Sequence, residues 1–214
     1  MANWCYAEII FYSTSREEIE MMQARIDRIN HTTNTPYGAY RFELFANEYG
    51  LDCGEPNWLD GEVDYISPVI FNNDYYYFNV NTQTRWDLHL NLWILIIEKC
   101  YPQIKIAYFA EESGSEFFAR YDETGCFFRE NYYIDGYLPS NVSEDSGFYI
   151  EDSCYEDFNT LLVWINENVG INVGYNTVSK IQSTINSYLV DAYEEDDFWI
   201  QINEFKVAHP SLYP

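Results

Sequence analysis

Acidic residues outnumber Lys and Arg by 35 to 11, which gives a net charge of -24 to a chain that is 19% Phe, Trp and Tyr. Acid-rich chains stay unfolded when they lack apolar surface to bury, but 47% of this chain is hydrophobic. The combination predicts a compact protein with an aromatic core and a strongly negative surface. Like charges on a compact surface repel one another, so a basic partner or a need for solubility is the expected explanation.

The 214 residues suffice for one elaborated domain or two small ones. The best apolar run, residues 92–97, is far shorter than the ~18 residues that indicate a membrane-spanning helix. The N-terminus has no basic stretch followed by an apolar one, so we expect a cytoplasmic protein without a secretory signal. The five cysteines are widely spaced without a CxxC pair, and we expect them to be reduced and mostly buried.

The first part of the chain predicts a strand followed by a helix. Residues 5–12 are rich in β-branched and aromatic side chains, as in a strand. Ser15 and Glu18 have the spacing of a capping box, and the helix that they open repeats apolar residues every three or four positions. Residues 39–49 are compatible with a short helix or a strand, since their periodicity does not decide.

A hairpin and a strongly apolar helix are expected next. Two extended runs, 63–71 and 75–80, flank Asn72-Asn73-Asp74, whose side chains tolerate the backbone of a tight turn. Residues 88–100 are apolar on nearly every side, so this helix should be covered, lying across a sheet. Two further strands are predicted, at residues 104–109 and 117–121.

The last third has a different character. Residues 135–157 look like an acidic loop, and Ser153 with Glu156 predicts a second capping box, for a helix closed by Gly170. The remaining expected elements are a helix at 177–193 and a strand at 198–207. We therefore expect an α+β fold, with helices on one face of an antiparallel sheet in residues 1–135 and a mostly helical, acidic extension in residues 136–214.

Several short motifs carry a resemblance to a known family. They are Asn3-Trp4-Cys5, Thr84-x-Trp86, Tyr101-Pro102 and Glu111-Glu112-x-Gly114-x-x-Phe117. In order and spacing, residues 1–135 resemble the Api92-like, YubB-type ferredoxin-like domain family of phages, plasmids and bacteria. The chain departs from that pattern at Ala2, where the family usually has Pro, and at residues 87–89, where it usually has a Ser-Pro-Pro-like run. The resemblance implies a ferredoxin-like core and a mobile-element context, but no catalytic residues.

Signals for catalysis or cofactors are weak. His31, His89 and His209 lack the spacing of metal ligands, and no phosphate-binding glycine loop is present. Glu111 and Glu112 precede a glycine and are the most suggestive pair for a cation or for acid–base chemistry, although a solvated strand end explains them better. We expect no metal and no cofactor.

Acidic residues are concentrated between residues 111 and 157, where thirteen acids accompany only Arg120 and Arg129. Gathered on a face of about 1,200 Å², this segment would match the charge density of duplex DNA, roughly one per 100 Å². The predicted partner-binding residues are Glu111, Glu112, Glu116, Asp122, Glu123, Glu144, Asp145, Glu151, Asp152, Glu156 and Asp157.

The sequence thus predicts a non-enzymatic acidic interaction protein of phage or plasmid origin. It would bind the basic groove of a bacterial host defence protein as a DNA-mimic inhibitor, of the anti-CRISPR or anti-restriction type. Direct binding to nucleic acid or anionic membranes is disfavoured by the charge. Two alternatives remain open: a structural or housekeeping module whose acidity only maintains solubility, and a metal-dependent enzyme that uses carboxylates.

Overall fold

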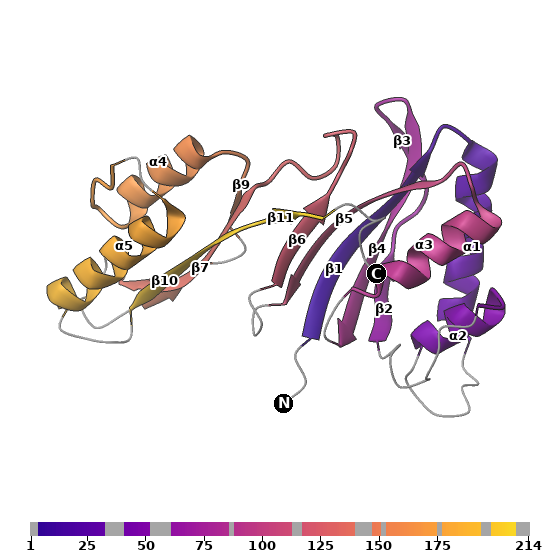
Figure 1. Cartoon of the computed structure of the whole chain (residues 1–214), viewed down its shortest axis with the longest axis horizontal. Coiled ribbons are helices and arrows are strands. Elements are labelled where there is room, and N and C mark those ends of the chain that lie inside the picture. Colours follow the sequence, from indigo (N-terminus) through magenta and orange to yellow (C-terminus); the bar gives the residue numbers. More distant parts are fainter. Residues whose placement is uncertain are drawn as a thin grey trace. The chain divides into compact units, whose positions relative to one another are not determined.

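The chain is α+β and divides into two compact units (Figure 1). The computed structural model describes residues 4–32, 41–51, 61–85, 88–112, 117–139, 147–150, 153–174, 177–193 and 198–208. Unit 1 is Met1–Phe128 together with Lys206–Pro214, and unit 2 is Arg129–Phe205. Unit 2 is therefore an insertion, because the chain leaves unit 1 and later returns to it. The sequence suggested a single division, after residue 135.

Unit 1 is built on one sheet, with the strand order β11-β6-β5-β1-β4-β2 and with β3 also paired to β4. All of these strand pairs are antiparallel except the parallel pair of β11 with β6. The strands are β1 (Trp4–Ser13), β2 (Gly61–Ile66), β3 (Ile70–Asn72), β4 (Tyr75–Arg85), β5 (Lys105–Glu112), β6 (Phe117–Tyr121) and β11 (Lys206–Val207). The helices are α1 (Arg16–Asn30), α2 (Arg41–Glu48) and α3 (Leu90–Cys100).

The local sequence signals of unit 1 mostly predicted its caps and turns correctly. Ser15 caps α1, since its hydroxyl accepts from the Glu18 N–H at 3.4 Å. The Glu18 carboxylate does not turn back to Ser15, however, but accepts from the Gln103 main-chain and side-chain N–H groups at 3.3 and 3.1 Å. The hairpin turn is confirmed, with Asn73 and Asp74 at φ values of 51° and 69°.

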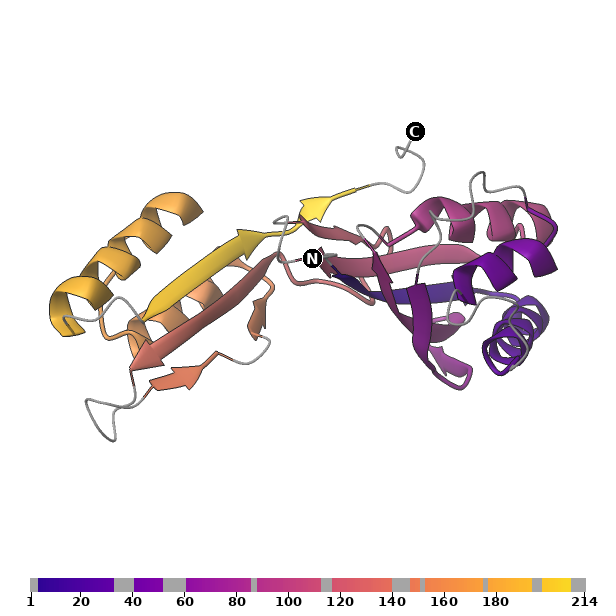
Figure 2. The ribbon, with the colours of Figure 1, turned by 90° about the horizontal axis from the view of Figure 1, so that it is seen from below.

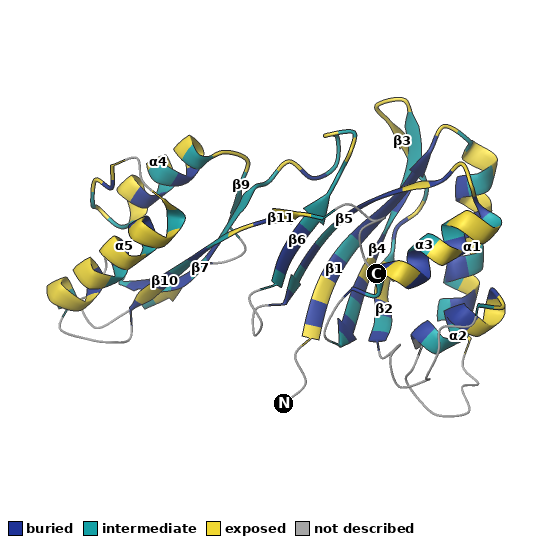
Figure 3. Ribbon diagram, viewed as in Figure 1, coloured by how far each residue is buried: buried dark blue, intermediate teal, exposed yellow. Residues whose placement is uncertain are grey.

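Two expectations for unit 1 were wrong in detail. The run 63–71 is not one strand, because it breaks at residues 67–69, where Pro68 has no N–H to donate to a ladder. Helix α3 is not covered on nearly every side, since buried and exposed residues alternate along it (Figure 3). Leu95 is 40% exposed, while Trp93 and Ile96 are fully buried. A buried stripe against the sheet suffices to hold such a helix.

Three helices cover one face of the unit 1 sheet (Figure 2). Trp93 is at the centre of the core, with ring centroids 5.3 Å from Phe11 of β1 and 5.6 Å from both Phe42 and Phe45 of α2. These edge-to-face and tilted contacts suit the quadrupoles of the rings. Aromatic side chains thus form much of the core of unit 1, as the composition predicts.

Unit 2 has its own sheet, with the strand order β10-β7-β8 and with β9 also paired to β7. Its elements are β7 (Tyr132–Pro139), β8 (Gly147–Tyr149), β9 (Ser153–Tyr155), α4 (Phe158–Asn168), α5 (Val178–Tyr193) and β10 (Trp199–Glu204). The two helices pack on one face of this sheet, and Ile134, Ile165, Ile185 and Ile200 form the centre of a second core.

The expected loop over residues 135–157 was wrong in its described part, which contributes to three strands. Gly136 hid the strand signal, because glycine is typical of turns. In the structure Gly136 is required by close packing, since a Cβ there would lie 2.5 Å from the Trp199 carbonyl oxygen of the neighbouring strand. The second capping box was also wrong: Ser153 lies in β9, and Asp157 caps α4 instead. Gly170, at φ +77°, follows the end of α4 as expected.

Candidate interaction surface

The predicted acidic residues are divided between the two units. Glu111, Glu112, Asp122 and Glu123 belong to unit 1, whereas Glu156 and Asp157 belong to unit 2. The other five lie outside the described residues: Glu116, Glu144, Asp145, Glu151 and Asp152. The candidate segment therefore crosses the boundary between two separately folded parts.

Asp122 has a structural role in unit 1. One carboxylate oxygen accepts from the Thr124 N–H and hydroxyl at 2.9 and 2.7 Å, and the other accepts from the Phe127 and Phe128 N–H groups at 2.7 and 3.0 Å. Burial acts to raise the pKa of Asp122, but these bonds outweigh it and the pKa falls below its usual value. The carboxylate thus fixes a loop that packs Phe127 and Phe128 against the sheet face opposite the helices.

The remaining unit 1 candidates are either shielded from solvent or paired with a neighbour. Glu112 is 2% exposed and Glu111 is half-buried. Glu123 is exposed but forms an ion pair with Lys105 and accepts from the Tyr121 hydroxyl at 3.3 Å. These side chains present little uncompensated charge to a partner.

The two described candidates of unit 2 are both exposed. Asp157 accepts from the Thr160 hydroxyl at 2.7 Å and from the Asn159 and Thr160 N–H groups at 2.8 and 3.0 Å. The pKa of Asp157 is lowered, first by the bond from the Thr160 side chain and then by the main-chain bonds. The carboxylate therefore keeps its charge to lower pH than an ordinary aspartate, at the positive end of α4.

Charge is distributed unevenly between the units. Counting acids over residues 111–157 concealed this difference, because that segment spans both units. Unit 2 has fifteen acids and only Arg129 and Lys180 as bases, a net charge of -13 in 77 residues. Unit 1 has twenty acids and nine bases, a net charge of -11 in 137 residues. Folded chains of these sizes expose about 4,900 and 7,500 Å². Unit 2 therefore has one net charge per ~370 Å², against one per ~680 Å² in unit 1.

Exposed carboxylates occur on several elements of unit 2. The described ones are Glu156, Asp157, Glu167, Asp191 and Glu204. Two bases can neutralise only a small share of fifteen acids, whatever their positions. In unit 1, by contrast, Glu48 of α2 forms ion pairs with both Arg25 and Arg28 of α1. The uncompensated negative surface is therefore denser in unit 2.

A polar groove runs beside β10, an edge strand of unit 2. The Asn186 side chain of α5 accepts from the Ile200 N–H at 2.8 Å and donates to the Ile200 carbonyl at 3.1 Å. The side-chain amide oxygen of Gln182 accepts from the Ile202 N–H at 2.9 Å. These bonds cover an edge that would otherwise invite strand pairing. Towards the start of α5 a cavity of about 580 Å³ lies between α5 and β10, and Glu204 is one of its lining residues.

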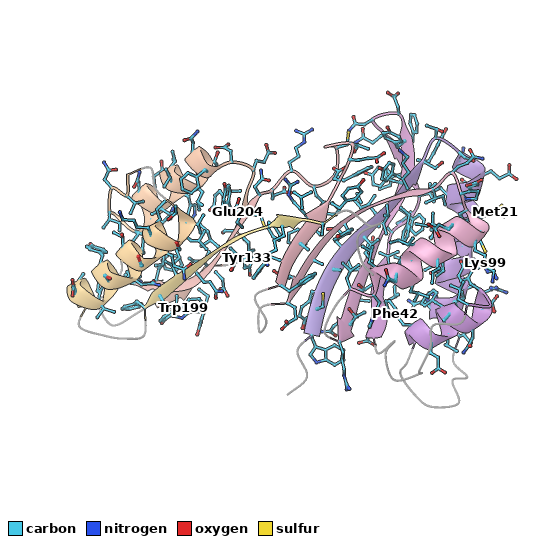
Figure 4. The ribbon with its side chains drawn as sticks, in the orientation of Figure 1. Met21, Phe42, Lys99, Tyr133, Trp199 and Glu204 are labelled. Carbon is cyan, nitrogen blue, oxygen red and sulfur yellow. The ribbon has the colours of Figure 1, made fainter. Side chains whose placement is uncertain are left out.

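Each sheet also has a face opposite its helices that carries aromatic residues. In unit 1, Trp4 and Tyr6 are 38% and 50% exposed, and the Arg85 guanidinium lies 5.4 Å from the Trp4 ring centroid. In unit 2, Tyr133 and Trp199 lie on the corresponding face (Figure 4), and Trp199 is 37% exposed. Rigid, amphipathic rings of this kind are common at protein interfaces.

The described residues contain no group of three or more His, Cys, Asp and Glu that could hold a metal ion. His31 is exposed beside Asp27, and His89 precedes α3 in a left-handed conformation next to Phe42, while His209 lies outside the described part. The four described cysteines are unbridged, and only Cys5 is buried. Among the described helices, none is both long and apolar enough to cross a bilayer.

Comparisons with family models, curated proteins and solved structures found no match to this chain.

Proposed function

We propose that the protein is a non-enzymatic acidic interaction protein whose unit 2 binds the basic groove of a nucleic-acid-binding protein. The observation that carries the proposal is the excess of fifteen acids over two bases in a unit of 77 residues with its own core. The partner class follows from charge, because a groove built for the phosphate backbone is lined with Lys and Arg. A host defence protein of the CRISPR or restriction type fits this description and places the complex in the bacterial cytoplasm.

Charge density supports mimicry only if the acids of unit 2 are gathered on one side. Spread evenly, the acids of unit 2 give one net charge per ~370 Å², a much lower charge density than the one per roughly 100 Å² of duplex DNA. A face of about 1,300 Å² that held all thirteen net charges would reach the DNA value. The exposed Trp199 and Tyr149 add contact area that a purely electrostatic attraction lacks.

For unit 1 we propose a ferredoxin-like core and kinship with the Api92-like, YubB-type family. Apart from the additional α2 and β3, the element order β1-α1-β2-β4-α3-β5 has the βαββαβ pattern, and the sheet order β5-β1-β4-β2 is antiparallel throughout. Thr84, Tyr101 and Glu112 of the shared motifs are all buried, so the motifs would preserve the core rather than a reaction centre. On this proposal unit 1 is a scaffold from mobile elements, into which unit 2 is inserted.

The test is capture of bacterial proteins on the immobilised full-length chain, followed by elution with duplex DNA. We expect the captured proteins to be nucleic-acid-binding proteins that duplex DNA displaces. Partners without a nucleic-acid site, or partners that excess duplex does not displace, would refute mimicry. Failure to capture any basic protein would favour the alternative in which the acidity only maintains solubility.

A further inference from the structure

The groove between α5 and β10 combines hydroxyl groups, side-chain amides, one carboxylate and two apolar side chains. It is lined by Thr177, Val178, Ser179, Gln182, Ser183, Asn186, Ile202 and Glu204. The Ser183 hydroxyl donates to the Lys180 carbonyl at 3.0 Å, which leaves its oxygen lone pairs available as acceptors. The Thr177 and Ser179 hydroxyl oxygens are 3.5 Å apart and add further acceptors. No Lys or Arg is found among the lining residues that the structure describes.

The pairing of β10 brings main-chain acceptors to the same place. Because Ile200 bonds outward to Asn186, it lies at a position whose N–H and C=O point away from β7. This direction alternates along an antiparallel strand, so the carbonyls of Ile202 and Glu204 also point toward α5. Ile202 and Glu204 both line the groove, so these carbonyls add main-chain acceptors beside it.

Among the described residues of the lining, Glu204 is the only charged one, and it lies on the helix-covered face of the sheet at the end of β10 (Figure 4). Val178 and Ile202 give the groove apolar walls. Two apolar side chains beside hydroxyl oxygens and one carboxylate complement a methylene chain with a terminal ammonium, which has three donors and no acceptor.

We propose that this groove receives a lysine side chain of the basic partner. The walls are already held in place, since Asn186 and Gln182 are fixed by β10, so little ordering is needed on binding. The inference rests on the proposed function and names the group that unit 2 recognises. It places one specific contact within an otherwise diffuse negative surface.

The experiment is an amide NMR titration of the full-length chain with Nα-acetyl-lysine methylamide, with the arginine analogue and 1,5-diaminopentane as comparison probes. We expect selective shifts at Ser179, Ser183 and Glu204 and weaker binding of the arginine analogue. Glu204→Gln should weaken lysine-analogue binding about tenfold through loss of the one carboxylate. Asp191→Asn, which removes a charge from α5 outside the groove, should change it less than about twofold.

Equal losses of lysine-analogue affinity in the two variants would show that binding depends only on diffuse negative charge, and would overturn the inference. Absence of amide shifts at the groove residues would also overturn the inference. Unchanged thermal melting of the variants excludes misfolding as the cause of weaker binding. Binding of the diamine much tighter than that of the lysine analogue would assign the groove to free polyamines and also overturn it. The capture of partners that duplex DNA displaces is a separate experiment. The proposed function can therefore stand or fail independently of these results.

Discussion

Unit 1 and unit 2 are both sheets with helices on one face, but they are stabilised by different means. Unit 1 has an aromatic core around Trp93 and ion pairs on its helices. Unit 2 has a largely aliphatic core, and α5 protects its edge strand through Asn186 and Gln182. Unit 2 also carries more net charge on about half as many residues. Strong acidity is therefore tolerated in the smaller unit, where self-repulsion acts against stability. On the proposed function, this uncompensated charge serves to bind the basic partner.

The largest expected effect is on the core of unit 1. Trp93→Ala removes a fully buried ring that contacts three other rings, and should lower the free energy of unfolding of unit 1 by about 3–5 kcal/mol. The two cores share no residue, so the unfolding of unit 2 should be unaffected. Denaturant unfolding followed by NMR resolves the units. An equal shift of the unfolding midpoints of both units would show that they unfold as one. Ile185→Ala, in the core of unit 2, is the reciprocal variant.

Asp122→Asn should destabilise unit 1 by about 2–3 kcal/mol at neutral pH, because an amide presents N–H groups where four donors require a carboxylate. Since the folded pKa is lowered, the contribution of Asp122 exists above the usual value near 3.8 and disappears as pH falls through the folded pKa. The difference in unfolding free energy between variant and wild type should therefore narrow in acid. A gap that stayed constant from neutral to acidic pH would contradict this origin.

Asn186→Ala should have a smaller effect, about 1–2 kcal/mol, restricted to unit 2. It removes both side-chain bonds to Ile200 and exposes part of the β10 edge. Amide hydrogen exchange at Ile200 should accelerate, whereas Ser187→Ala, an exposed neighbour on α5, should leave exchange unchanged. Equal protection in both variants would mean that α5 packing alone shields the edge.

The sequence was informative where structure is decided by neighbours along the chain. Ser15, Asn73-Asp74 and Gly170 act within a few residues, so a cap, a turn and a helix end could be recognised. The three-residue strands β8 and β9 are too short to show a period, and Gly136 conceals the strand that pairs with both. The insertion could not be seen, because the return of β11 to β6 joins positions more than 80 residues apart.

The acidic site was harder to predict for a related reason. A carboxylate that fixes a loop, such as Asp122, and one that faces solvent, such as Glu156, are the same kind of residue in a sequence. Only the hydrogen bonds distinguish them. Counting charge within a window of sequence therefore mixed structural acids of unit 1 with exposed acids of unit 2, whereas counting within folded units separates them.

The central claim is that unit 2 carries the binding surface, and matched charge removal tests it directly. One variant neutralises four exposed acids of unit 2, Glu156, Glu167, Asp191 and Glu204, and the other neutralises four of unit 1, Glu17, Asp64, Asp74 and Glu98. Affinity is measured for the captured, duplex-displaceable partner. We expect the unit 2 variant to lose at least about tenfold and the unit 1 variant less than about threefold. Equal losses would show that only net charge matters and would contradict the account.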